Sequence, residues 1–556
     1  MRRLLVVLTL LTPLSFAARP SQRHGMVVAV SPPGADVGRD VLLAGGNAVD
    51  AAVATAFAMA VTYPSAGNLG GGGFMLVHPA TGKGEPVVID YRETAPLAAS
   101  RTMFTKKDTW YSHRAVGVPG TVAGLYLAHQ RFGRLPWKDV VSPAVRLAGE
   151  GFVIDAQLAS SLGWALRGTQ VTPEFVRAYG KDGGKSDWQA GDRIVLSDLA
   201  RTLRRIQERG PDGFYKGETA ELIVQEMRAG GGLISAEDLA RYRAKLREPI
   251  RGSYRGYDVY APPPPSSGGV CLVEMLNILE TFDLNRHPRY SAETLHLMTE
   301  AMRRAYRDRA AYLGDQDFVK NPAHLTTKEY ARKLALGIDL KKATPSESLA
   351  GEIKLADEKT HTTHYSVLDA SGMAVSTTTT LEDSFGSKVV VRGGGFLLNN
   401  EMTDFNPVPG VTNRKGQVGT EPNLIAPGKR MLSSMTPTIL VKDGRPALIT
   451  GSPGGRTIIN TVLGVVVNVV DYDMPLHQAV DAPRMHQQWF PDRVQLETAT
   501  WEKHADAVTR LEKMGHRVLK VRAQGDAHSI CYNAKGGRYE GVMDPRRAGR
   551  PAAFRE

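Results

Sequence analysis

Hydrophobic residues follow two different periods along the chain, and the change of period divides it into two parts. Small apolar residues run almost without interruption from Ala48 to Val61, which predicts a buried helix. Between about Pro119 and Asp315 apolar positions mostly recur at helical spacing. After about His361 the spacing becomes an alternation, and residues 363–368 and 373–381 predict the two strands of a hairpin. The chain therefore combines a largely helical first part with a β-rich second part.

A second predicted hairpin leads directly into a glycine-rich loop and a helix. Its strands are 438–441 and 447–450, joined by Asp443-Gly444. The loop Gly451–Gly455 follows, and then an apolar helix over 456–470. Such a loop presents backbone N–H groups at the positive end of the helix dipole, where an anion or oxyanion can bind. Strands and helices from both parts of the chain predict layered sheets covered by helices.

A long helix is predicted after Ser291, which is a suitable N-cap. Its apolar face comprises Leu295, Met298, Met302 and Tyr306. Its arginines are expected on the outer, solvent-facing side, namely Arg303, Arg304, Arg307 and Arg309. Ahead of this helix, the proline run 262–265 predicts a rigid bend before another apolar helix.

Glycines and histidines show none of the familiar cofactor or metal patterns. The four glycines Gly70–Gly73 precede a short apolar strand, so the backbone there is expected to pass close to a bulky group. They lack the spacing of a dinucleotide site, and no lysine follows Gly451–Gly455 as a P-loop requires. His477 and His486 have no metal-ligand spacing, and a GxSxG nucleophile elbow is absent. The sequence predicts neither a cofactor nor a metal.

The composition is that of a globular protein. Of the 556 residues, 42% are hydrophobic and 23% are charged, which excludes disordered and fibrous classes. The net charge of +12 is not gathered in a basic stripe, so no nucleic-acid partner is predicted. A mild positive field favours small anionic substrates.

The first 17 residues have the pattern of a signal peptide. Two arginines precede an apolar core from 4 to 14, and small residues lead to a predicted cut after Ala17. The core is too short for a membrane span, and no later stretch is long enough. We therefore expect an exported protein, periplasmic or secreted, without a membrane span. Cys271 and Cys531 are expected to be free, semi-buried thiols, although the sequence leaves a disulfide between them open.

A threonine-rich stretch and several further blocks resemble the γ-glutamyltransferase (glutathione hydrolase) family of N-terminal-nucleophile hydrolases. The stretch Thr362-Thr363-His364-Tyr365-Ser366-Val367 is similar to the start of that family's small subunit. The other similar blocks occur in family order and cover essentially the whole mature chain: 67–75, 91–93, 263–269, 398–405, 432–438 and 451–455.

The resemblance implies an α+β fold, a four-layer αββα sandwich, in a precursor that cleaves itself. Thr362 Oγ would attack the carbonyl of His361, and water would hydrolyse the resulting ester. Removal of the signal peptide, residues 1–17, and this cut would give a large subunit, 18–361, and a small catalytic subunit, 362–556. The two would form one intertwined heterodimer.

The new terminus explains how a threonine can act as a nucleophile. Cleavage gives Thr362 a free α-amine, whose usual pKa of ~7.7–8.0 lets it accept the Oγ proton near neutral pH. The resemblance also assigns Thr380 to a hydrogen bond with the nucleophile. It assigns Gly454 and Gly455 to the oxyanion hole, in agreement with the helix-terminus argument above.

The same resemblance assigns substrate-binding residues to the two ends of a γ-glutamyl head group. Arg92 would bind its α-carboxylate with a planar guanidinium, helped by the Ser433 and Ser434 hydroxyls. The carboxylates of Asp404, Glu401 and Glu382 would bind its ammonium group. In the predicted lid loop, 409–420, Lys415 stands where some relatives carry an aromatic residue.

The predicted activity is hydrolysis and transfer of the γ-glutamyl group of glutathione and related amides, through an ester on Thr362. Water, amino acids or peptides would be the acceptors. A cephalosporin (glutaryl) acylase of the same fold would need no ammonium pocket, and a poly-γ-glutamate depolymerase would favour an open cleft without a lid. A non-enzymatic member would not need to retain Thr362, Thr380, Gly454 and Gly455. The sequence leaves open the balance of hydrolysis and transfer, the acceptor, the behaviour of the lid loop and further assembly.

Overall fold

A computed structural model describes residues 21–22, 25–104, 108–351, 356–357, 363–547 and 550–553. The predicted signal peptide and the predicted cleavage pair His361–Thr362 lie outside these residues. Within the described part of the chain, none of the helices combines the length and the apolar character that crossing a bilayer requires.

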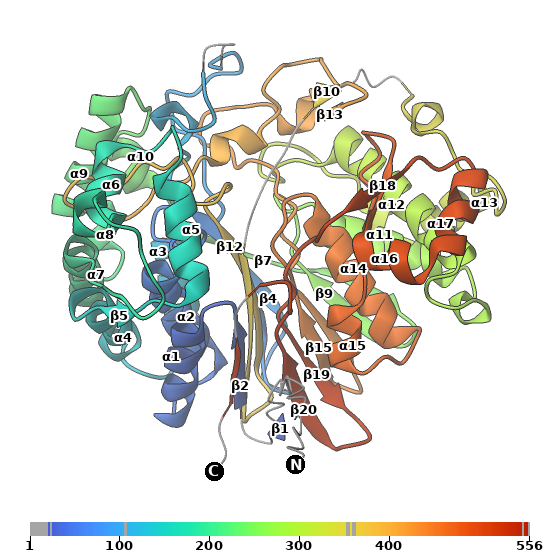
Figure 1. Cartoon of the computed structure of the whole chain (residues 1–556), viewed down its shortest axis with the longest axis horizontal. Helices are drawn as coiled ribbons and strands as arrows, with labels where there is room; N and C mark the ends of the chain where they lie inside the picture. Colours follow the sequence, from blue (N-terminus) through green and yellow to red (C-terminus); the bar gives the residue numbers. More distant parts are fainter. Residues whose placement is uncertain are drawn as a thin grey trace, which may run out of the picture.

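Two antiparallel sheets of seven strands each lie face to face in the centre of the molecule (Figure 1). The strands of the first sheet, in sheet order, are β21 (Arg550–Ala553), β2 (Gly25–Ala29), β11 (Thr363–Asp369), β12 (Ala374–Thr380), β3 (Gly72–His78), β4 (Val87–Asp90) and β7 (Lys245–Arg247). Those of the second sheet are β1 (Ser21–Gln22), β20 (Arg538–Val542), β19 (Ser529–Asn533), β15 (Arg445–Thr450), β14 (Thr438–Lys442), β9 (Tyr257–Ala261) and β8 (Ile250–Tyr254).

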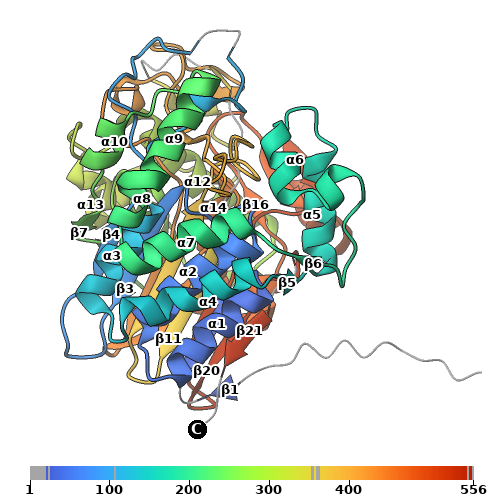
Figure 2. The same cartoon turned by 90° about the vertical axis from the view of Figure 1, so that its left-hand side faces the viewer.

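Helices cover the outer face of each sheet, which completes four layers (Figures 1 and 2). On the first sheet lie α1 (Pro32–Leu43), α2 (Ala48–Thr62), α3 (Thr121–Phe132) and α4 (Trp137–Gly149), followed outward by α5 (Ala156–Leu166), α6 (Pro173–Tyr179), α7 (Ser197–Arg209), α8 (Asp212–Tyr215), α9 (Gly217–Gly230) and α10 (Ala236–Arg241). On the second lie α11 (Gly268–Glu280), α12 (Ala292–Tyr312), α13 (Lys328–Leu336), α14 (Thr457–Val470), α15 (Leu476–Asp481), α16 (Thr498–Lys503) and α17 (Ala505–Lys513). The predicted αββα sandwich is confirmed.

Short strands form three smaller pairings outside the two large sheets. The first joins β5 (Phe152–Val153) to β6 (Arg193–Ile194), and the second joins β10 (Ala356–Asp357) to β13 (Gly416–Gln417). The third comprises β16 (Met485–His486), β17 (Val494–Glu497) and β18 (Val518–Val521). The pairing of β10 with β13 ties the predicted lid loop to the segment that precedes the predicted cleavage site.

Alternation within the strands divides side chains between the two kinds of interior. On β3, Phe74 and Leu76 belong to the apolar cluster between the sheets, whereas Met75 and Val77 belong to the cluster beneath the helices. Helix α2 has a capping box at Asn47 and is buried over its whole length, as its almost continuous apolar pattern predicts.

Both sheets mix strands from either side of position 362. In the first sheet β11 and β12 lie between β2 and β3, and in the second β14 lies beside β9. The two predicted subunits therefore share both sheets and are not separate domains. Cys271 and Cys531 are both free thiols, as expected, the first buried and the second partly buried.

The prediction that the arginines of the long helix face solvent is wrong for Arg303, Arg304 and Arg309, which are buried on α12. The reason is that α12 packs against α11 and also against α17 and residues 346–349. Buried Glu300 pairs with both Arg303 and Arg304, and Arg303 also pairs with Asp492. These ion pairs offset the cost of removing the charges from water.

Candidate active site

A cavity lies where β12, the loop after β15 and the segment before β14 meet. Its lining gathers seven of the residues predicted for the site, from segments far apart in the sequence, together with two arginines that were not predicted. The residues are Arg92, Arg309, Thr380, Glu382, Asp404, Ser433, Ser434, Met435, Gly455, Arg456 and Ile458. Glu401 contacts Arg92 at this site, and Gly454 immediately precedes Gly455.

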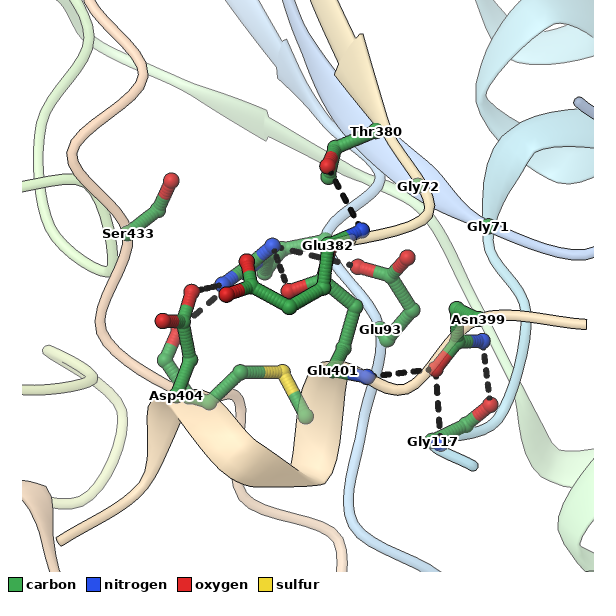
Figure 3. Close-up of polar contacts among 12 residues, drawn as sticks. Gly71, Gly72, Glu93, Gly117, Thr380, Glu382, Asn399, Glu401, Asp404 and Ser433 are labelled. Atoms are coloured by element: carbon green, nitrogen blue, oxygen red, sulfur yellow. Dashed lines mark hydrogen bonds and ion pairs between the residues drawn. The ribbon is translucent and has the colours of Figure 1, made fainter. Parts of the chain in front are cut away.

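The end of β12 places Thr380 and Glu382 at the cavity. Thr380 lies opposite Gly72 in the sheet, and its Oγ1 accepts a hydrogen bond of 2.7 Å from the backbone N–H of Glu382 (Figure 3). A Cβ on Gly71 would lie 2.0 Å from the carbonyl oxygen of Thr380. The run of glycines therefore lets β3 approach the end of β12 closely, which confirms the expected close approach of its backbone.

An asparagine positions the short helix that carries two acidic residues. Asn399 Oδ1 accepts hydrogen bonds from the backbone N–H groups of Gly117, at 2.8 Å, and Glu401, at 3.0 Å (Figure 3). The 3₁₀ helix Glu401–Asp404 follows. Its first and last residues are directed toward the guanidinium of Arg92.

Arg92 is buried among carboxylates. Its guanidinium lies 2.5 Å from Glu401 and 3.5 Å from Glu93, and it also pairs with Asp404. Burial disfavours the charged form of Arg92, but the carboxylates, Glu401 foremost, raise its pKa above the ordinary value. Burial raises the pKa of Glu93 to about 8 and that of Glu401 well above its usual range, against the lowering effect of Arg92.

Three carboxylates form a compact negative cluster beside Arg92. Glu382, Glu401 and Asp404 each offer an oxygen, and these oxygens lie within 4.8 Å of one another. Burial raises the pKa of all three groups. An ammonium group, with three N–H donors, matches this cluster. A hard cation would also find oxygen ligands there, but the guanidinium of Arg92 would repel it.

The bend 262–269 holds the two serines. The backbone N–H of Ser433 donates to the carbonyl of Pro265 at 2.7 Å, and that of Ser267 donates to the carbonyl of Ser433 at 2.8 Å. Ser433 Oγ accepts a hydrogen bond from the backbone N–H of Met435. Because this oxygen accepts one hydrogen bond from the protein, the hydroxyl proton can be donated to a ligand.

The loop Gly451–Gly455 joins β15 to α14. Gly454 and Gly455 have φ angles of 130° and 56°, in the region that favours glycine, and a Cβ on Gly454 would lie 2.4 Å from Thr457 Oγ1. The carbonyl of Gly454 accepts from the backbone N–H of Thr457, which starts the helix. Gly455 thus lines the cavity at the positive end of α14, and its role in an oxyanion site stays a prediction.

Strand β11 begins at Thr363, one residue after the predicted nucleophile, and Thr363 lies opposite Thr379. The start of β11 and the end of β12 are therefore neighbours at the same end of the sheet. His361 and Thr362 themselves lie outside the described residues.

Residues 34–554 match the family model described as Gamma-glutamyltranspeptidase. The chain belongs to the gamma-glutamyltranspeptidase family. It is 47% identical to the Glutathione hydrolase proenzyme of Escherichia coli (strain K12) over 94% of this chain and 90% of that protein. It is 40% identical to the Acylase ACY 1 proenzyme of Pseudomonas sp. (strain SE83) over 93% of this chain and 91% of that protein.

A solved structure supports the same fold. The crystal structure of cephalosporin acylase from Bacillus halodurans matches with a TM-score of 0.85 and 27% identity, covering 99% of this chain and all of that one. Both glutathione hydrolases and acylases thus occur among the relatives of this gamma-glutamyltranspeptidase-family chain.

Sequence analysis missed four residues that shape this family site: Glu93, Arg309, Asn399 and Arg456. Glu93 and Asn399 lie inside blocks that carry the resemblance, close to residues that were singled out. Arg309 was assigned to solvent because helical spacing alone does not show that α12 is covered on both sides. Arg456 directly follows the predicted oxyanion glycines, and that position was the available signal.

Proposed function

We propose that this chain is a γ-glutamyl hydrolase and transferase that cleaves the γ-glutamyl amide bond of glutathione and related compounds. The observation that carries the proposal is the pairing of a carboxylate cluster with guanidinium and hydroxyl donors in one cavity. A γ-linked glutamyl group exposes an ammonium and a carboxylate on one carbon, so it needs acceptors and donors side by side. Family membership supports the same activity.

Thr362 would be both nucleophile and base after cleavage of the His361–Thr362 bond. Its α-amine would take the Oγ proton, Oγ would attack the γ-carbonyl, and the amine of the leaving group would depart with a proton. Thr380 would orient the nucleophile. The backbone N–H groups of Gly454 and Gly455 would stabilise the oxyanion, and water or an acceptor amine would then release the ester.

The head group would be held by the charges around Arg92. Arg92, Ser433 and Ser434 would bind the α-carboxylate, while Asp404, Glu401 and Glu382 would bind the ammonium. Arg92 pairs with Glu401 and Asp404 themselves in this structure. Binding would therefore exchange part of these ion pairs for contacts to the zwitterion.

A cephalosporin (glutaryl) acylase is the second candidate, because relatives with acylase names match over nearly the whole chain. A glutaryl group has the same carbon chain but lacks the ammonium. The three converging carboxylates would then face an apolar methylene in place of the ammonium group, so they would lose the partner that a γ-glutamyl substrate supplies. This arrangement favours the γ-glutamyl substrate.

The deciding assay compares γ-glutamyl anilide with glutaryl anilide on the purified protein, with and without a dipeptide acceptor. We expect the γ-glutamyl compound to be cleaved at least tenfold more efficiently, since one charged hydrogen bond is worth about 1.5–3 kcal/mol. Faster cleavage of glutaryl anilide would replace the proposed activity with that of an acylase. We further propose export to the periplasm or the medium, on the signal-peptide pattern of residues 1–17.

A further inference from the structure

Two arginines that the proposed mechanism does not use, buried Arg309 and partly buried Arg456, line the cavity. Arg309 comes from the last turns of α12, and Arg456 precedes the first turn of α14. Arg309 donates hydrogen bonds to Ser267 Oγ, at 2.8 Å, and to Ser434 Oγ, at 3.1 Å. Arg309 therefore orients the hydroxyl of Ser434 and adds positive charge to the lining of the cavity.

Arg456 is placed at the reacting end of the cavity. It directly follows Gly455, one of the two proposed oxyanion glycines, and its carbonyl accepts a hydrogen bond from the hydroxyl of Tyr306. Arg456 and Gly455 thus line the same cavity side by side.

A second cavity adjoins the first across these same two arginines. Arg309 and Arg456 line both, and beyond them the second cavity is bounded by Val418, Gln488 and Phe490. Val418 belongs to the predicted lid loop. The head-group residues Arg92, Glu382 and Asp404 line only the first of the two cavities. The second cavity therefore extends away from the head-group end of the site.

The charge of the shared wall favours an anion. Burial, and then the neighbouring charge of Arg309, lower the pKa of Arg456 to about 9. Burial raises the pKa of Asp404, and the charges of Arg92 and then Arg309 act against that rise, so the positive charge of Arg309 reaches the first cavity. A carboxylate between the two guanidinium groups would relieve their mutual repulsion.

We propose that Arg456, with Arg309 beside it, binds the carboxylate of the group on the other side of the scissile bond, either the peptide that leaves or the peptide that accepts. This inference rests on the proposed function and adds to it a subsite for peptides with a free C-terminal carboxylate. Glutathione is such a substrate, because its leaving dipeptide ends in a carboxylate, whereas an anilide leaving group has none. Arg456 is then a specificity-determining residue and not part of the chemical step.

The test compares glutathione with the same tripeptide amidated at its C-terminus, which differs only in that carboxylate. For the wild-type enzyme we expect kcat/KM to be roughly tenfold to a hundredfold higher for glutathione, the range for a charged hydrogen bond. Arg456→Gln should bring the ratio of the two kcat/KM values close to one. Arg456→Lys should retain part of the preference, since it keeps the charge but loses the fork. Because both kcat/KM values come from the same variant, their ratio is not affected by a general loss of activity caused by the substitution beside Gly455.

Arg286→Gln is the matched control, because Arg286 is an exposed arginine outside both cavities, and its ratio should equal that of the wild type. An unchanged ratio in Arg456→Gln would overturn the inference. If that variant fails to fold or mature, the wild-type enzyme alone tests the inference. Equal wild-type kcat/KM values for glutathione and its C-terminal amide would overturn the inference. Hydrolysis of γ-glutamyl anilide by the wild type tests the proposed function separately, because neither outcome of the ratio affects it.

Discussion

At the scale of single residues, the site depends on a buried arginine that is charged because carboxylates surround it. Arg92 has 1% of its side chain exposed, and it contacts Glu93, Glu401 and Asp404. A planar guanidinium can face several carboxylates and still offer N–H groups to a ligand, which the compact ammonium of lysine cannot. The identity of this cation, and not only its charge, should therefore matter.

We predict that Arg92→Lys raises KM for γ-glutamyl anilide by roughly tenfold to a hundredfold, equivalent to losing about 1.5–3 kcal/mol of charged hydrogen bonding. The reason is the loss of the bidentate fork at the α-carboxylate. Steady-state kinetics measure the change, with Arg101→Lys, an exposed arginine, as the control. An unchanged KM would remove Arg92 from carboxylate binding.

The carboxylate cluster gives a prediction about pH. Burial, and then the charges of Asp404 and Glu401, raise the pKa of Glu382 well above its ordinary value. The interaction is reciprocal, so Glu382→Gln should lower the pKa of the remaining pair. Because the substrate ammonium needs ionised carboxylates, we expect the acid limb of the kcat/KM profile for γ-glutamyl anilide to move to lower pH.

A pH–rate profile from pH ~5 to ~9 measures this shift. Glu237→Gln, which removes an exposed carboxylate, should leave the profile in place. An acid limb that stays at the wild-type position in Glu382→Gln would show that the cluster does not titrate with substrate binding.

At the scale of elements, the ends of β3 and β12 set the position of Thr380. We predict that Gly71→Ala lowers the free energy of unfolding by about 1–3 kcal/mol, the usual cost of overpacking, and reduces activity. The new Cβ would fall 2.0 Å from the Thr380 carbonyl. Gly464→Ala is the matched control, because Gly464 lies within α14 with open space around it and alanine should stabilise the helix by about 0.5–1 kcal/mol. Equal stability of Gly71→Ala and wild type would contradict the proposed close contact.

Elements with a strong local pattern were predictable from the sequence. The almost continuous apolar run over 48–61 and the two hairpins formed as expected, because capping and alternation act between neighbouring residues. The burial of Arg303 and Arg309 was not predictable, since their partners lie far along the chain. Arg303 contacts Ser346 and Asp492, and Arg309 contacts Ser267 and Ser434. Burial on a helix depends on such tertiary partners and not on its own period.

The candidate site was likewise predictable only in part. Arg92, Asp404 and Ser433 were identified through family resemblance, but nothing in their spacing shows that they meet. Their convergence requires the sheets to bring together segments more than three hundred positions apart, as the pairing of Arg92 with Asp404 shows. The direct ion pairs of Arg92 with Glu401 and Asp404, which were predicted to bind the ammonium group, were not foreseen for the same reason.

At the scale of the whole molecule, buried histidines couple stability to pH. Burial lowers the pKa of His486 to about 4 and that of His516 to about 3, from an ordinary value of 6.5. A histidine that is neutral when folded and protonated when unfolded stabilises the fold above pH 6.5, and this contribution is lost as the pH falls toward the folded pKa.

We predict that His486→Gln makes the free energy of unfolding less sensitive to acid. Between pH ~6.5 and ~4.5 the wild type should lose about 2–3 kcal/mol more than the variant, at about 1.4 kcal/mol per pH unit. Urea unfolding at the two pH values measures the difference, and His287→Gln serves as the comparison at a histidine that is not fully buried. Parallel losses in all three proteins would contradict a role for buried His486.

The two parts of the chain share both sheets, so a cut before Thr362 would leave the subunits interlocked. Intact-mass measurement of the purified wild type and of Thr362→Ala, with N-terminal sequencing of the smaller product, tests the proposed self-cleavage most directly. We expect two chains from the wild type, the smaller beginning at Thr362, and one uncleaved, inactive chain from Thr362→Ala. A folded wild type that remains a single chain, or a variant that still divides at this bond, would contradict the mechanism.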